Sequence, residues 1–330
     1  MRRVLLLVVV LVMGFVGVVL YLTNAPIELD SPIVVTIDKG LSTGAIADRL
    51  DSAGVLRSRR VFAWWAKLRR IDRQLRPGRY QFEGAIDIND VLDILRQGLA
   101  VKVKVTIPEG WTVERTAGYL AAELQFDSAK FMALTHESDL LRQYDIPADQ
   151  MEGYLLPDTY EFYWGVEPGD VIDALVKANE AVFVDSVTEQ MAKLGWDRHQ
   201  VLTLASMIEA ETGIADERPM ISGVFHNRLE KGMLLQCDPT VIYAMGGLDG
   251  RPLLRKDLTY DSPYNTYVYA GLPPGPICNP GRDAIVAAVF PYMTDALYFV
   301  ADGSGGHTFS RTLAEHNSAT ARARRERRSK

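Results

Sequence analysis

The sequence contains little cysteine and little histidine, which narrows the chemistry open to it. Only Cys237 and Cys278 occur among its 330 residues, together with five scattered histidines. Their spacing matches no metal-ligand pattern, so we expect no metal and no cofactor. Outside the cytoplasm the two thiols could form a disulfide, but two buried free thiols fit the sequence equally well.

An excess of positive charge is absent as well. The net charge is −6 and no basic patch is interleaved with aromatic residues, so we predict no nucleic-acid partner. The exception is a basic tail at 321–330, which has six cations and one glutamate. We interpret the tail as a solvated helix end, with contact to anionic lipid as the alternative. With 48% apolar and 24% charged residues, the chain can form a globular core, and its length allows two domains.

Charge is missing altogether from Val4–Leu22, which is long enough to cross a hydrocarbon core of about 30 Å. Arg2 and Arg3 precede this segment, and no cation follows it until Lys39, so the basic flank should stay in the cytoplasm. A cleaved signal peptide would have a shorter apolar core and a small-x-small cleavage site. We therefore predict a cytoplasmic stub at 1–3, a transmembrane anchor at 4–22, and export of the rest of the chain.

The region 31–100 is predicted to be a small α+β unit. Its expected elements are a strand within Ser31–Asp38, a helix capped by Ser42 or Thr43, a helix over Val61–Leu68, a strand over Arg79–Phe82, and a helix from Asp87 that ends at Gly98. Trp64 and Trp65 would suit sugar stacking if exposed, but aromatics at helical spacing are more often core residues. The unit is a plausible binding module.

The region 101–320 differs from the preceding unit in its pattern of polar and apolar residues. It opens with the strictly alternating run Val101–Ile107, which predicts a half-buried strand, and Thr112 is expected to cap the next helix. From about residue 150 onward, polar residues, glycines and prolines gather in loops between short apolar runs. That pattern is typical of a site built from loops.

A helix from Arg198 to about Thr212, capped by Asp197, carries the first candidate chemistry. Its predicted buried stripe consists of Val201, Leu204, Ala205 and Ile208. Glu209 and Glu211 then fall on opposite shoulders of this amphipathic helix. A carboxyl half-buried in apolar surroundings has a raised pKa, which a general acid needs at neutral pH. Small neighbours that leave room for a substrate favour Glu209 slightly, and helix geometry alone nearly leaves a tie.

Four polar runs raise the prospect of a carbohydrate site. They are EGYLLPDTY at 152–160, VFHNRLEKGMLLQCDPTVIY at 224–243, YNTYVYAGLPPG at 264–275 and DGSGGHTFSRTLAEHN at 302–317. Together they supply amides, hydroxyls, aromatics and carboxylates, beside glycines or prolines that fix the backbone. Such groups hydrogen-bond sugar hydroxyls and stack on pyranose rings. Turn chemistry could explain any one run, but four in one domain favour a binding cleft.

In order and spacing, these runs together with LASMIEAET at 204–212 and YFVADGSGGHTF at 298–309 resemble the YceG-like family of endolytic murein transglycosylases, often called MltG. The resemblance covers essentially the whole chain. It implies an α+β architecture with an N-terminal transmembrane helix, a LysM-like subdomain at 31–100 and a YceG-like catalytic domain at 101–320. Cys237 and Cys278 are its main departures from the family pattern.

The resemblance also implies an activity and its residues. The catalytic residue would be Glu209, the first glutamate of the E-x-E-T pair. Positions matching family motifs, which would line or support the cleft, are Glu152, Gln236, Asp238, Tyr264, Asn265, Thr266 and His307. For Asp238, Asn265 and Thr266, ordinary turn and cap chemistry is an equally good interpretation. No cofactor is implied.

The implied reaction is non-hydrolytic cleavage of the β-1,4 bond between N-acetylmuramic acid and N-acetylglucosamine, which leaves a 1,6-anhydro-N-acetylmuramic acid end. The protein would face the periplasm from the inner membrane and limit the length of nascent peptidoglycan strands, beside glycan-polymerising penicillin-binding proteins. Two alternatives stay open. One is a non-enzymatic peptidoglycan-binding scaffold, and the other is a hydrolase that pairs Glu209 with Glu152 or Asp238.

Overall fold

The computed structural model describes residues 2–98, 100–248, 250–303 and 305–329; of these, the side chains of 2–9, 11, 12, 15 and 327–329 are not described. The chain is a mixed α+β protein, as predicted. It separates into two compact units. Unit 1 contains 1–105, 123–126 and 161–166, and unit 2 contains 106–122, 127–160 and 167–330.

The N-terminal segment is a helix, α1 (Arg2–Asn24), which spans the predicted anchor at Val4–Leu22. In the part of the chain that the structure describes, no helix combines the length and apolarity needed to cross a membrane. Many of the side chains of α1 fall outside that part. The anchor therefore stays a prediction.

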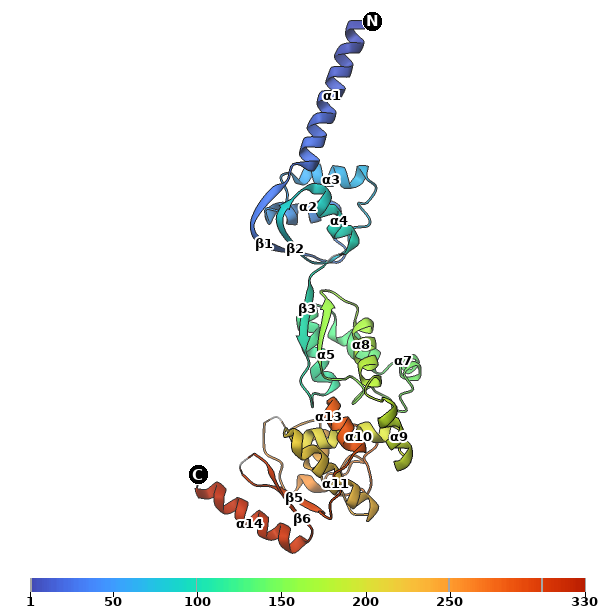
Figure 1. The fold of residues 1–330 in the computed structure, drawn as a ribbon, viewed down its shortest axis with the longest axis vertical. Helices are drawn as coiled ribbons and strands as arrows, with labels where there is room; N and C mark the ends of the chain where they lie inside the picture. Colours follow the sequence, from blue (N-terminus) through green and yellow to red (C-terminus); the bar gives the residue numbers. More distant parts are fainter. Residues whose placement is uncertain (1, 99, 249, 304, 330) are drawn as a thin grey trace. The chain divides into compact units, whose positions relative to one another are not determined.

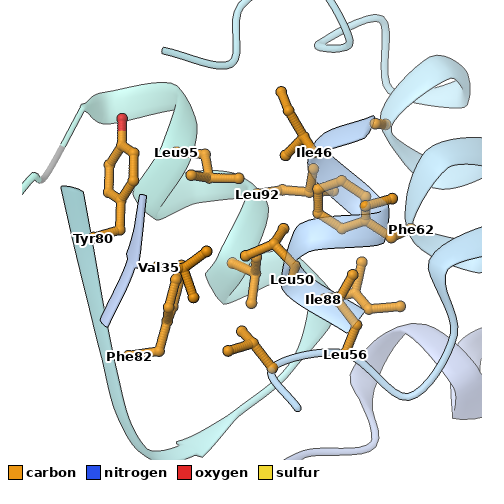
Figure 2. Close-up of a cluster of buried hydrophobic side chains, with 14 of the residues drawn as sticks. Val35, Ile46, Leu50, Leu56, Phe62, Tyr80, Phe82, Ile88, Leu92 and Leu95 are labelled. Atoms are coloured by element: carbon orange, nitrogen blue, oxygen red, sulfur yellow. The ribbon is translucent and has the colours of Figure 1, made fainter. Parts of the chain in front are cut away.

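Unit 1 is built on an antiparallel pair of strands, β1 (Ile27–Ile37) and β2 (Gly78–Ile86). Three short helices accompany it: α2 (Thr43–Ser52), α3 (Arg59–Leu68) and α4 (Ile88–Gln97). Figure 2 shows the core of this unit, in which side chains from both strands and all three helices meet, among them Val35, Leu50, Phe62, Phe82 and Leu92. Burial of these side chains is what stabilises so small a unit.

Local sequence signals explain the helix ends of unit 1. Ser42 caps α2 through its hydroxyl, and Asp87 forms a capping box at the start of α4. Gly98 ends α4 in the left-handed conformation, at φ 71°. These predictions are confirmed. Of the two tryptophans, Trp64 is 44% exposed, whereas Trp65 is partly buried and donates its indole N–H to Asn89. The likeness of this unit to LysM stays a prediction.

The middle of the chain begins with β3 (Lys102–Thr106), which pairs with β4 (Thr159–Tyr163) in a two-stranded sheet. Thr112 caps the next helix as predicted, since its hydroxyl accepts the Arg115 N–H at 3.3 Å. The helices up to residue 194 are α5 (Val113–Leu124), α6 (Ser128–Thr135), α7 (Ser138–Gln143), α8 (Pro168–Glu180) and α9 (Asp185–Leu194).

The remaining elements build the site. They are α10 (Arg198–Glu211), η1 (Ala215–Glu217), α11 (Arg218–Glu230), α12 (Asp238–Ala244), η2 (Asp257–Thr259), α13 (Arg282–Val289), β5 (Tyr298–Ala301), β6 (His307–Ser310) and α14 (Leu313–Ser329). Strands β5 and β6 form an antiparallel hairpin beside α14, which contains the basic tail (Figure 1).

The helix α10 differs from its prediction in one respect. Asp197 caps it in a capping box with Gln200, as expected. The four residues of the predicted stripe are buried, but so are the other four residues from Val201 to Ile208, so the helix is not amphipathic as predicted. The reason is that α13 and α11 pack against α10 (Figure 1), together with contacts from α12. The middle of such a central helix has no solvent face, and only its two ends are partly exposed.

Candidate active site

A polar cleft of about 380 Å³ opens at the C-terminal end of α10 in unit 2. Its lining comes from α10, α11, α12, the loop before α12, the 264–269 loop, the β5–β6 hairpin and α14. The lining residues are Glu211, Arg228, Gln236, Asp238, Tyr267, Tyr298, Phe299, Val300, Ala301, His307, Leu313 and His316. Three of the seven predicted accessory residues, Gln236, Asp238 and His307, therefore come together here.

Glu211 is the carboxyl of α10 that lines this cleft. Burial, together with the charge of the nearby Asp238 carboxylate, raises its pKa to about 7. A hydrogen bond with the Cys237 thiol and electrostatic interactions with the nearby His307 and Arg228 side chains oppose that shift. A carboxyl with a pKa near 7 is protonated in a large fraction of molecules at neutral pH, which suits a general acid.

Two side chains organise the floor of the cleft. Arg228 of α11 is buried, and its guanidinium donates to the carbonyls of Leu297 at 2.7 Å and Leu235 at 2.6 Å. Tyr267 donates its hydroxyl proton to the Asp238 carboxylate at 2.6 Å. Fixed donors of this kind hold both groups in one orientation before a ligand arrives.

Gln236 occupies an unusual backbone conformation beside the cleft. Its φ is 48°, in the left-handed region that costs a non-glycine residue free energy. A hydrogen bond from the Gln236 N–H to the Thr266 carbonyl, at 3.0 Å, stabilises this strained conformation. The side chain is exposed at the cleft, where an amide can both donate to and accept from a sugar hydroxyl.

His307 begins β6 and is paired with Glu217 at the end of η1. Its backbone N–H donates to Glu217 Oε1 at 2.8 Å, and its ring Nδ1 lies 2.7 Å from Glu217 Oε2. The Thr212 hydroxyl donates to the same Oε2 at 3.3 Å. The pair connects the end of α10, η1 and the hairpin, so it helps to fix the wall of the cleft.

Glu209, the predicted catalytic residue, lies in different surroundings. Its side chain is 5% exposed, and its carboxylate accepts from Arg218 Nη2 at 2.9 Å and from the Gly281 N–H at 3.0 Å. Arg218 is itself buried and also contacts Glu109 at 2.7 Å. Burial raises the pKa of Glu209, the Glu109 charge adds to this, and the contacts with Gly281 and Arg218 oppose it. The Glu209 carboxylate is thus paired with Arg218 and the Gly281 backbone, and the expectation that small neighbours leave room for a substrate stays a prediction.

Glu152 lies apart from the polar cleft. It lines a larger and mainly apolar cavity of about 730 Å³, with Gln150, Tyr243 and Cys278 among its neighbours. Its carboxylate accepts from the Val113 N–H at 3.1 Å, and burial raises its pKa to about 8. Ala210, between the two glutamates of α10, also lines this cavity.

Asn265 and Thr266 support the cleft without lining it, whereas the Tyr264 ring packs against Tyr243 of the larger cavity, with centroids 5.1 Å apart. Asn265 is fully buried and bridges its own loop, donating to the carbonyls of Leu258 and Tyr260. Thr266 is buried and accepts the Cys237 N–H at 3.0 Å. The interpretation of Asn265-Thr266 as turn chemistry describes these contacts. Both cysteines are buried and free, so the disulfide alternative is not realised.

The sequence profile of the YceG-like family matches residues 35–322, which include this whole site. The chain belongs to the YceG-like family. An endolytic murein transglycosylase of Bacillus subtilis (strain 168) is 35% identical over 315 residues, covering 89% of this chain and 86% of that protein. An endolytic murein transglycosylase of Streptococcus pneumoniae (strain R6) is 29% identical, and the match covers 88% of this chain and 60% of that protein.

A solved YceG-like structure supports the same assignment. The crystal structure of a YceG-like protein from Listeria monocytogenes superposes with a TM-score of 0.62 at 32% sequence identity. The match covers 88% of this chain and 99% of that chain.

Several residues of the YceG-like site went unrecognised in the sequence. Glu109, Glu217 and Arg218 are single charged residues, which carry no spacing signal. Arg228 and Tyr267 lie inside two of the polar runs and were passed over within them. A weak signal did exist for Glu217, since an ERP sequence directly starts a helix and proline favours the first helical turn.

Proposed function

We propose that the chain is an endolytic peptidoglycan lytic transglycosylase. It would cleave the β-1,4 bond between N-acetylmuramic acid and N-acetylglucosamine within a strand, leaving 1,6-anhydro-N-acetylmuramic acid ends. Membership of the YceG-like family and the names of its curated relatives support the reaction class. The observation that carries the proposal is Glu211, a carboxyl with a pKa of about 7 that opens into a polar cleft.

The choice of acid lies between the two glutamates at the end of α10. The family resemblance favours Glu209, and the geometry favours Glu211. The Glu209 carboxylate is committed to Arg218 and Gly281, whereas Glu211 lines the cleft with Gln236, Asp238 and His307. A general acid must reach the leaving oxygen through a cleft that admits substrate. We therefore assign the acid to Glu211 and give Glu209 a structural role.

The lytic reaction needs only one carboxyl. Glu211 would protonate the glycosidic oxygen as the bond to C1 of N-acetylmuramic acid breaks, and the N-acetylglucosamine leaves as an alcohol. The resulting carboxylate would then take the proton of the C6 hydroxyl as that oxygen bonds to C1. An intramolecular nucleophile has a high effective concentration, and it outcompetes water if the closed cleft excludes solvent. Gln236, which can donate and accept, and Asp238, which accepts, would hold the sugar hydroxyls by hydrogen bonds.

A second candidate is a muramidase-type hydrolase, because Asp238 lines the same cleft as Glu211. Such an enzyme uses one carboxyl as acid and the other as nucleophile or water-activating base. The tyrosine hydroxyl that donates to Asp238 would stabilise its charged form for that role. The two reactions differ in the mass of the product by one water.

The setting of the enzyme is part of the proposal. The uncharged run Val4–Leu22 in α1 would anchor the chain in the inner membrane, with the site on the periplasmic side. Unit 1 would act as a LysM-like module that binds the glycan. Penicillin-binding proteins that polymerise glycan would be its neighbours. The basic tail would stay a solvated end of α14.

The test is digestion of purified murein by the full-length protein, with mass spectrometry of the new ends. Wild type, Glu211→Gln and Glu209→Gln are compared, with Glu189→Gln, an exposed residue of α9, as the matched control. We expect ends one water lighter than hydrolytic ends from wild type and the control, and none from Glu211→Gln. Circular dichroism checks that each variant is folded.

The other outcomes each remove one part of the proposal. Ends with water added would make the protein a hydrolase. Loss of cleavage in folded Glu209→Gln, with Glu211→Gln still active, would return the acid to Glu209. No cleavage by folded wild type would favour a non-enzymatic peptidoglycan-binding scaffold.

A further inference from the structure

Both oxygens of the Glu217 carboxylate contact His307. Oε1 accepts the His307 backbone N–H at 2.8 Å, while Oε2 lies 2.7 Å from ring Nδ1. Burial tends to raise the pKa of Glu217, but the hydrogen bonds from His307 lower it more, so this carboxylate is ionised at neutral pH. An ionised carboxylate only accepts hydrogen bonds. Nδ1 must therefore carry a proton.

The surroundings hold the ring in place on other sides. The Phe299 ring packs edge-on against His307, with centroids 5.5 Å apart. A Cβ atom at Gly306, the preceding residue, would lie 2.8 Å from Glu217 Oε1, so glycine permits the close approach of this loop. With Nδ1 committed to Glu217, Nε2 is the one ring nitrogen left for the cleft that His307 lines.

We propose that Glu217 is a positioning residue that fixes His307 as its Nδ1–H tautomer, so that Nε2 accepts a hydrogen bond from a sugar hydroxyl in the cleft. The identity of this ligand rests on the proposed function. Fixing a histidine tautomer through a carboxylate on its other nitrogen is a general device in enzymes. Here it gives the cleft a hydrogen-bond acceptor, His307 Nε2 on β6, in addition to the proposed acid Glu211 on α10.

A purely structural latch is the competing explanation, in which Glu217 only ties the hairpin to η1. The substitution Glu217→Gln separates the two. The amide can still accept the His307 N–H through its oxygen, so the latch is largely kept. Its NH₂ group would then face Nδ1, which must become an acceptor, and the proton moves to Nε2. The acceptor in the cleft is replaced by a donor.

The experiment uses the full chain with ¹⁵N-labelled histidine. The two ring nitrogens of His307 are assigned by comparison with a His307→Asn variant. Spectra are recorded in a pH series until the ring signals stop changing, so that the neutral tautomer is read. We expect Nδ1–H in wild type and in Glu217→Asp, which keeps the charge, and Nε2–H in Glu217→Gln. Glu189→Gln, exposed on α9, should match wild type.

Turnover on murein strands gives the second readout. We expect kcat of Glu217→Gln to fall about 10- to 100-fold with KM little changed, and Glu217→Asp to recover part of the rate. An Nε2–H tautomer in wild type, or wild-type turnover by Glu217→Gln with a flipped tautomer, would overturn the proposal. The spectra need no substrate, so a failure of the proposed function leaves the tautomer assignment independently tested.

Discussion

The two glutamates at the end of α10 are two residues apart and meet opposite surroundings. Glu209 is enclosed by Arg218, Glu109 and the Gly281 backbone, in an ion cluster with almost no exposure. Glu211 opens into a polar cleft, and its strongest opposing contact is the thiol of Cys237. Burial raises both pKa values, but of these two carboxyls only Glu211 is among the residues that line the polar cleft. A raised pKa alone therefore does not identify a catalytic acid.

The largest effect is expected from breaking the ion cluster at Glu209. Arg218→Met would leave a buried carboxylate without its cation, which costs about 3–5 kcal/mol of unfolding free energy. Chemical denaturation of the full chain measures this cost. Arg282→Met, on the exposed face of α13, is the matched control and should change stability little. If Arg218→Met were as stable as the control, the cluster would not be structural.

A double substitution sharpens this prediction. Replacing Glu209 and Arg218 together by methionine removes both charges, so most of the stability lost in Arg218→Met should return. A double variant as unstable as the single one would mean that packing around Arg218, and not its charge, matters.

The contrast between the two glutamates also shows which features of the structure could be predicted from the sequence. Helix ends in unit 1 were predictable, because Ser42, Asp87 and Gly98 act on their own neighbours through caps and a left-handed turn. The all-round burial of α10 was not, because it depends on how other helices pack, among them α13, which lies far along the chain. Local signals carry local structure, whereas burial depends on tertiary contacts.

The same limit applied to the site. Gln236, Asp238 and His307 were predicted from the family resemblance, and the structure brings them to one cleft. Glu152 carried the same kind of signal but lies in another cavity, since spacing along the chain says nothing of which loops meet. The tie between Glu209 and Glu211 could not be resolved from helix geometry, because what separates them is Arg218, nine residues further along the chain.

The second prediction concerns the pH dependence of cleavage. A general acid works in its protonated form, so the rate should fall about tenfold for each pH unit above the pKa of Glu211, which is about 7. If Glu209 were the acid instead, this fall in rate at high pH should persist in Glu211→Gln. The pH–rate profile is measured from initial rates on murein strands between pH 5 and 9, with folding checked at each pH.

The same group makes stability depend on pH. Its pKa is about 7 when folded and near the ordinary 4.5 when unfolded, so the folded state holds the extra proton between these values. The stability that it contributes is therefore present below pH 4.5 and lost as the pH rises to about 7. The difference in unfolding free energy between wild type and Glu211→Gln should change across that window and stay constant above it. A constant difference throughout would mean that Glu211 is not buried as a neutral acid.

A smaller effect is expected at Cys237, whose thiol hydrogen-bonds to the Glu211 carboxylate and lowers its pKa. Cys237→Ala removes that donor, so the upper limb of the pH–rate profile should move to higher pH. Cys237→Ser supplies a stronger donor, so the limb should move to lower pH. Cys278→Ala is the control, since Cys278 lies outside the polar cleft. Shifts of the same sign in both Cys237 variants would exclude the hydrogen bond as their cause.

The smallest effect is expected at Gln236, where strain and function meet. Its φ of 48° suits glycine, so Gln236→Gly should relieve the strain and raise the unfolding free energy by up to about 1 kcal/mol, less the entropy that glycine gains in the unfolded chain. The substitution also removes an amide from the cleft, so the affinity for murein strands should fall while the pH limb set by Glu211 stays in place. Gln125→Gly, at another left-handed position with φ 58°, is the matched control for stability alone. If both glycine variants gain stability and only Gln236→Gly binds murein more weakly, the strained backbone at 236 serves to present the Gln236 side chain. If Gln236→Gly binds murein as wild type does, Gln236 is only a turn residue.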